Sequence, residues 1–167
     1  MSLNKNITFI FSKPINNRFP IFSWLIRLFE NTKYSHVSMH FYSESLDRTI
    51  IYEAAGAETR FIGRNMWEKH CQPLFKFKIE ITNDQYVKLM QHCIDTSGMK
   101  YGLKLAFGMV LAKVFSLKKN PFSDLNKKVC STAIGELLVD LDYKIDKNLE
   151  LLTPEDIFNI LYSKASI

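Results

Sequence analysis

Three residues of types used in nucleophilic catalysis stand far apart in this chain: Cys130, His36 and Glu53. Apolar residues recur at helical spacing from Ile134 to Leu141, and Cys130 lies one turn earlier on the same stripe. In the first turn of a helix, the positive end of the helix dipole and free backbone N–H groups favour a thiolate over a thiol. Cys130 is therefore predicted to be a nucleophile that needs a histidine base. The alternative is a small, inert core cysteine.

Two histidines lie in the segment 34–42, where polar and apolar residues alternate as in a strand. His36 and His40 share the polar face of this strand. Residues four apart on a strand are about 13 Å apart, too far to bind one metal ion together. We therefore disfavour a metal site built on His36, His40 and His70, and we expect no cofactor. Either histidine could be a half-exposed sheet residue, and this is the prediction for His40, whereas His36 stays open as a candidate base.

Glu53 interrupts an apolar run, 49–55, which is predicted to be a strand that forms a hairpin with 34–42. A carboxylate inside such a run needs a partner, because burying it alone costs free energy. An imidazole on the neighbouring strand would be such a partner. The alternative is a glutamate at the sheet edge that faces water.

Three further strands complete the predicted sheet. They lie at residues 7–11, within 56–71, and at 74–81, where the alternation is clearest. The chain between the last two is predicted to be a loop that carries Trp67, with His70 and Cys71 as loop and core residues.

Helices are predicted to follow and to pack on this sheet. Thr82 and Gln85 have the spacing of a capping box, and the helix that they begin carries Cys93 on its apolar stripe, which indicates a structural cysteine. The segments 22–29 and 103–115 are predicted to be short buried helices, with lipid contact as the alternative. A helix from Cys130 and a last one that begins near Pro154 complete the set.

Length and composition set the class of protein. The chain has 167 residues, of which 47% are apolar, and we expect residues 1–167 to form one α+β domain: an antiparallel sheet of about five strands packed with helices. Three cysteines without a C-x-x-C pair argue against a disulfide framework and against a zinc module, which favours a reducing compartment.

Charge and hydropathy bear on partners and location. The net charge of +5 is spread along the chain, which predicts weak attraction to anionic surfaces, membrane surfaces included, and no specific nucleic-acid binding. The first residues lack a signal-peptide core, and no run reaches the roughly 20 apolar residues of a membrane span. A cytoplasmic location is therefore expected.

Five short motifs then carry a resemblance to a known family. Their order along the chain resembles that of the circularly permuted NlpC-type papain-like cysteine hydrolases, the branch that includes YiiX-like proteins and lecithin:retinol acyltransferases. The motifs are Ser35-His36-Val37, Tyr52-Glu53-Ala54, Lys100-Tyr101-Gly102, Val129-Cys130-Ser131 and Leu152-Thr153-Pro154-Glu155-Asp156. In this branch the histidine and the acid precede the cysteine, as they do here. The third motif departs from the family, in which an acid often follows the tyrosine, so Tyr101 receives no role.

The resemblance implies a permuted papain-like fold, with Cys130 as nucleophile, His36 as base and Glu53 as the group that orients the imidazole. We then expect the sulfur and a ring nitrogen of His36 within about 4 Å of each other. The implied reaction is hydrolysis of an amide or ester bond, with a peptide, isopeptide or lipid ester as substrate. A lipid acyltransferase or phospholipase with the same residues, and a catalytically silent binding module, are the alternatives.

Overall fold

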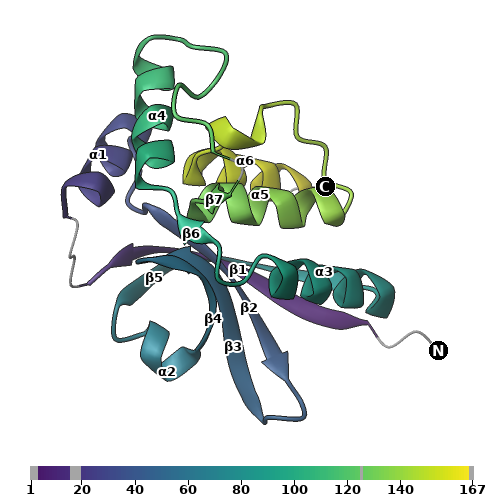
Figure 1. Cartoon of the computed structure of the whole chain (residues 1–167). Helices are drawn as coiled ribbons and strands as arrows, with labels where there is room; N and C mark the ends of the chain where they lie inside the picture. The colour runs from purple at the N-terminus through teal and green to yellow at the C-terminus, as the bar shows by residue number, and fades with distance from the viewer. Residues whose placement is uncertain (1–3, 16–19, 125, 166–167) are drawn as a thin grey trace.

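The computed structural model describes residues 4–15, 20–124 and 126–165 (Figure 1). Seven strands form one sheet in the order β5-β1-β2-β3-β4-β6-β7. Neighbouring strands are antiparallel except β6 and β7. The strands are β1 (Lys5–Pro14), β2 (His36–Ser43), β3 (Arg48–Ala55), β4 (Glu58–Gly63), β5 (Cys71–Ile81), β6 (Lys100–Tyr101) and β7 (Lys127–Lys128).

The α+β class is confirmed, but the prediction of about five strands is wrong. The two additional strands, β6 and β7, are only two residues long. A segment of two residues is too short for a period-2 pattern, so sequence alternation cannot reveal it. These short strands extend the sheet toward the start of the helix that carries Cys130.

The helices lie mainly on one face of the sheet (Figure 1). They are α1 (Pro20–Glu30), α2 (Arg64–Trp67), α3 (Asn83–Asp95), α4 (Leu103–Val114), α5 (Cys130–Asp140) and α6 (Pro154–Ala165), with a 3₁₀ turn at Leu149–Leu151. Helix α5 packs on β2 and β3 and is flanked by α3 and α6. Helix α2 packs on β3 and β4, where Trp67 meets the ring of His40 edge-on, with centroids 4.7 Å apart.

The core lies between the sheet and α5. Alternate residues of β1 and β2 supply one side, and the apolar stripe of α5 supplies the other. The core thus joins residues at the strand period of two with residues at helical spacing. The fully buried members include Ile7, Phe9, Phe11, Val37, Met39, Ile134, Leu137 and Leu138. Because α5 is held on this side by the core, the position of its first residue, Cys130, is fixed by packing rather than by a loop.

Two sequence predictions about α3 are confirmed. The Thr82 side chain accepts a hydrogen bond from the backbone N–H of Gln85, whose side chain accepts from the N–H of Thr82, which completes the capping box. Cys93 is fully buried in the core, and burial raises the pKa of its thiol well above the ordinary value. Cys93 is therefore an inert, structural cysteine.

Helices α1 and α4 are less buried than predicted. Trp24 and Leu28 of α1, and Phe107 and Val114 of α4, are exposed. The two helices contact each other at one end of the molecule, so only part of each apolar surface is covered. No helix in the described part of the chain combines the length and the apolar character needed to cross a bilayer.

The loop after α4 is fixed by a buried asparagine. Asn120 donates hydrogen bonds to the carbonyls of Leu105 (3.0 Å) and Glu150 (3.2 Å), and its side-chain oxygen accepts from the N–H of Phe122 (2.9 Å). Gly108 lies directly against this amide, where a Cβ atom would overlap the Asn120 oxygen. The asparagine therefore joins α4 to the segment that precedes α6.

Candidate active site

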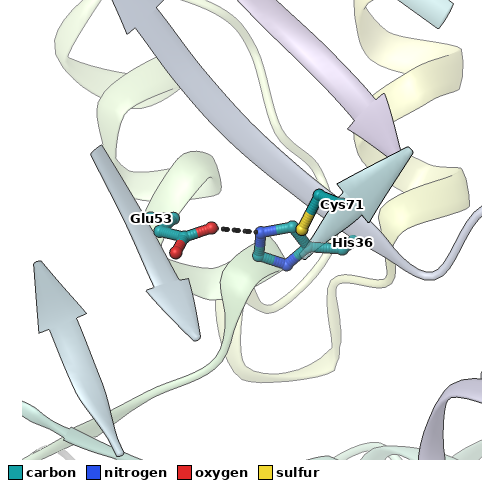
Figure 2. A group of neighbouring side chains, drawn as sticks. All are labelled: His36, Glu53 and Cys71. Atoms are coloured by element: carbon teal, nitrogen blue, oxygen red, sulfur yellow. Dashed lines mark hydrogen bonds and ion pairs between the residues drawn. The ribbon is translucent and has the colours of Figure 1, made fainter. Parts of the chain in front are cut away.

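His36 and Glu53 meet on neighbouring strands. His36 is the first residue of β2, and Glu53 lies near the end of β3. Because β2 and β3 pair antiparallel, these two positions lie close together. The Nε2 atom of His36 lies 2.9 Å from Oε2 of Glu53 (Figure 2). Glu53 is buried, with a side chain only 2% exposed, so it is not a water-facing edge residue.

Arg60 holds the other oxygen of Glu53. Gly56 and Ala57 form the turn between β3 and β4, and this two-residue turn sets a register in which Arg60 lies directly opposite Glu53. Arg60 donates to Oε1 of Glu53 through Nε (3.1 Å) and Nη2 (2.8 Å). Burial alone would raise the pKa of Glu53, but the hydrogen bonds and charges of His36 and Arg60 lower it to about 2. The carboxylate is therefore ionised at neutral pH.

Cys130 lies at the start of α5, against the beginning of β2. The residue is 4% exposed, and its sulfur is 3.9 Å from the carbonyl oxygen of Ser35. Burial alone would raise the pKa of the thiol, but the hydrogen bond and charge of His36, together with backbone N–H groups of Val37 and Ser131, lower it below the ordinary value. The environment thus favours a thiolate at this cysteine.

The imidazole of His36 connects the thiol to the carboxylate. Burial alone would lower its pKa, but hydrogen bonds with Cys130 and Glu53 outweigh burial and raise the pKa well above the ordinary value. Since Nε2 faces Glu53, Nδ1 is left for the thiol. The three predicted site residues are thus brought together, with the imidazole between the thiol and the carboxylate. Such an arrangement could serve a cysteine–histidine pair with an orienting acid.

His40 has no part in this arrangement. Its Nε2 atom lies 3.0 Å from the hydroxyl of Ser38, and its ring packs on Trp67. Burial lowers the pKa of His40 to about 3, so the ring is neutral at physiological pH. It is a buried core histidine rather than the half-exposed sheet residue that was predicted.

A pocket opens beside Cys130, between α1, α4 and the start of α6. Most of its lining is apolar: Ile26, Phe29, Ala106, Met109, Val110 and Pro154. Its polar residues largely satisfy one another, because Glu30 accepts from Lys113 (2.6 Å) and from the hydroxyl of Thr153 (2.8 Å). Tyr101 also lines the pocket, and burial followed by the nearby charges of Cys130 and Glu53 raises the pKa of its phenol.

Among the described residues, one group of three side chains could bind a metal ion. His36, Glu53 and Cys71 each offer a ligand atom, and these atoms all lie within 4.8 Å of one another (Figure 2). This group differs from the one weighed from the sequence, since neither His40 nor His70 belongs to it.

Sequence reasoning missed two residues of this region. Arg60 could have been found, because a two-residue turn at 56–57 fixes which residue of β4 faces Glu53. Cys71 could not: it reaches the site through β5, which pairs with β1 in a register shifted near Ser12. No local pattern predicts a pairing between strands so far apart in sequence.

No protein-family model matches the chain, and no curated protein is significantly similar to it. Among solved structures, the chain is similar to the crystal structure of the metalloprotein YiiX from Escherichia coli O157:H7. The two are 16% identical, the match covers 95% of this chain and 92% of that chain, and the TM-score is 0.49.

Proposed function

We propose that this protein is a cysteine-dependent hydrolase that cleaves an amide or ester bond through Cys130, His36 and Glu53. The observation that carries the proposal is the buried chain of contacts from the thiol through the imidazole to an ionised carboxylate. The order of the three residues along the chain is that of the permuted papain-like branch that the sequence resembles.

The Cys130 thiolate attacks the substrate carbonyl and forms a covalent acyl intermediate. His36 gives its proton to the leaving group and later takes one from the water that releases the acyl group. Glu53 holds the imidazole in one orientation, and Arg60 keeps the carboxylate ionised. The backbone N–H of Cys130 is the proposed oxyanion donor, because the first N–H groups of a helix have no carbonyl partner within it.

The test is formation of the acyl intermediate. Incubation with p-nitrophenyl acetate should release a burst of nitrophenol and add the mass of one acetyl group to the peptide that carries Cys130. Cys130→Ala should abolish both signals, whereas Cys93→Ala, which removes a buried cysteine without a base, should keep them. A folded wild-type protein that is never acylated at Cys130, by this ester or by a peptide nitroanilide, would leave only a silent binding module.

The lining of the pocket favours a second candidate, an acyl hydrolase or acyltransferase that acts on lipid esters. The space beside Cys130 has mostly apolar walls, and its charged residues are paired with each other. Such a lining suits an acyl chain better than a polar peptide, because each buried methylene contributes about 0.8 kcal/mol.

A series of acyl chain lengths separates the two candidates. For a lipid-ester enzyme, kcat/KM should rise several-fold from acetyl to decanoyl nitrophenyl esters, and Met109→Gln should reduce that rise without reducing turnover of the acetate. A flat series, together with faster cleavage of a peptide nitroanilide, would favour the amidase. Release of fatty acid from phosphatidylcholine vesicles would favour the lipid enzyme.

A further inference from the structure

Cys71 is the member of the metal-type cluster that the proposed reaction does not use. It begins β5 and lies beside the ring of His36, as Figure 2 shows, while Glu53 meets the same ring through Nε2. The three side chains come from β2, β3 and β5. The sheet therefore assembles a thiol, an imidazole and a carboxylate at one point.

These ligand types match those of a zinc site with three protein ligands. Bond lengths near 2.3 Å to sulfur and about 2.0–2.2 Å to nitrogen and oxygen require the ligand atoms to lie about 3.3–3.6 Å apart. The observed limit of 4.8 Å leaves only small side-chain shifts to be made. Arg60 keeps Oε1 of Glu53, so Oε2 stays directed at the cluster as an anionic ligand.

Ser12 supplies a second observation that points to a ligand here. It lies on β1 directly opposite His36, is fully buried, and its hydroxyl makes no well-formed hydrogen bond within the described residues. Its polar contact is with the Cys71 thiol, which is a weak hydrogen-bond partner for a buried hydroxyl. Because it lies against the Cys71 side chain, it is placed to donate to a metal-bound sulfur, as groups around metal ligands commonly do.

We propose that His36, Glu53 and Cys71 bind a zinc-like divalent cation, and that this binding stops the reaction at Cys130. The inhibitory part rests on the proposed function, whereas the metal site does not. On binding, the ion displaces the proton from Nε2 of His36 and the proton of the Cys71 thiol, and both protons pass to solvent. With the metal on Nε2, the ring keeps its remaining proton on Nδ1. Nδ1 therefore cannot take a proton from the thiol, and it could give its proton to the leaving group only by becoming an imidazolate, so the proton exchange that the reaction needs stops.

The metal site is tested without the proposed nucleophile. Full-length Cys130→Ala protein is titrated with Co²⁺, and a thiolate-to-cobalt charge-transfer absorption should develop in the near ultraviolet, which Zn²⁺ should displace. In the same background, Cys71→Ser should remove the absorption and weaken Zn²⁺ binding at least tenfold, whereas Cys93→Ser should change neither. A cobalt–thiolate absorption that survives Cys71→Ser, or that never develops in Cys130→Ala, would overturn the site.

Protection from alkylation gives a measurement that needs no change at Cys71. In Cys130→Ala, saturating Zn²⁺ should slow iodoacetamide labelling of Cys71 at least tenfold, and a chelator should restore the rate. Labelling that Zn²⁺ does not slow would contradict the proposal even if Cys71→Ser failed to fold.

Inhibition is tested on the wild-type protein. Zn²⁺ should inhibit ester turnover, and Cys71→Ser should need at least tenfold more Zn²⁺ to halve its own metal-free rate. Equal sensitivity of the two proteins would mean that the ion acts through Cys130 itself and would overturn the inhibitory role. A protein that binds Co²⁺ through Cys71 but never turns over ester would refute the hydrolase and leave the metal site intact.

Discussion

At the scale of the residue, Glu53 shares its two oxygens between partners of different kinds. Oε2 bonds the imidazole of His36, and Oε1 bonds the guanidinium of Arg60, which is permanently charged. Arg60 therefore offsets the cost of burying the carboxylate, and the negative charge of Glu53 remains to stabilise an imidazolium. That imidazolium in turn lowers the pKa of Cys130.

Glu53→Gln should reduce the reactivity of Cys130 at low pH. The amide keeps the shape and can still accept a hydrogen bond, but it lacks the charge that raises the pKa of His36. The pH at which Cys130 labelling by iodoacetamide is half-maximal should rise by about one unit, a loss of about tenfold in rate at pH 6. Thermal melts control for folding, and Cys93, buried without a base, should stay slow in both proteins. An unchanged profile would exclude Glu53 as the orienting acid.

The sequence was sufficient to pair His36 with Glu53, because an acid inside an apolar strand requires a partner and the hairpin supplies one. It was not sufficient for Cys71 or Ser12. Both reach the cluster through pairings of β1 with β2 and β5, which depend on the whole sheet rather than on local pattern.

At the scale of the element, α3 and α5 are joined by a charged network centred on His92. Its Nδ1 lies 2.7 Å from Oδ2 of Asp140 and its Nε2 lies 3.3 Å from Oε2 of Glu136. Lys128 also pairs with Glu136, which connects β7 to the same helix. The hydrogen bond with Glu136 is the main cause that raises the pKa of His92.

Stability from this network should decrease as the pH rises. Because the folded-state pKa of His92 is raised, its contribution is complete below the unfolded value of about 6.5 and is lost as the pH passes the raised pKa. His92→Gln should therefore be less stable than wild type near pH 6, and this difference should shrink toward pH 9 in urea unfolding curves. A difference that does not depend on pH would mean that the charge of His92 contributes nothing. The pKa of His36 is raised as well, but His36 is present in both proteins, so its contribution to the pH dependence cancels in the difference.

Helix α4 provides a steric test at Gly108. An added methyl group would overlap the amide of Asn120. The amide must then move, and it loses the hydrogen bond that it donates to the Leu105 carbonyl and the one that it accepts from the Phe122 N–H. Gly108→Ala should lower the free energy of unfolding by about 1–3 kcal/mol, although alanine favours helix. Gly63→Ala is the matched control, since no atom lies within 4 Å of an added Cβ there. If the two variants had nearly the same melting temperature, this packing would be contradicted.

The sequence predicted long elements better than short ones, for a physical reason. Strands β2 and β3 span 8 residues each and β5 spans 11, and α3 has its capping box, so each signal is local. The exposure of Trp24 and Phe107 depends on how much of α1 and α4 the rest of the molecule covers, which no helical period encodes.

At the scale of the whole molecule, the two tryptophans lie in opposite environments. Trp24 on α1 is 54% exposed, whereas Trp67 on α2 is 2% exposed and packs on His40. Acrylamide should quench the fluorescence of Trp24 strongly and that of Trp67 weakly. Trp24→Phe should leave a protein whose remaining emission resists quenching and lies at shorter wavelength. Strong quenching of that variant would contradict the burial of Trp67.

The proposed nucleophile and base come from different halves of the chain: β2 and β3 supply His36 and Glu53, and α5 supplies Cys130. A growing chain therefore carries an ordinary thiol until α5 closes the core, and an unfolded molecule carries one again. The contacts that lower the pKa of this thiol belong to the folded structure. The rate of Cys130 alkylation in mildly acidic buffer should therefore report the fraction of folded molecules, without any added dye or tag.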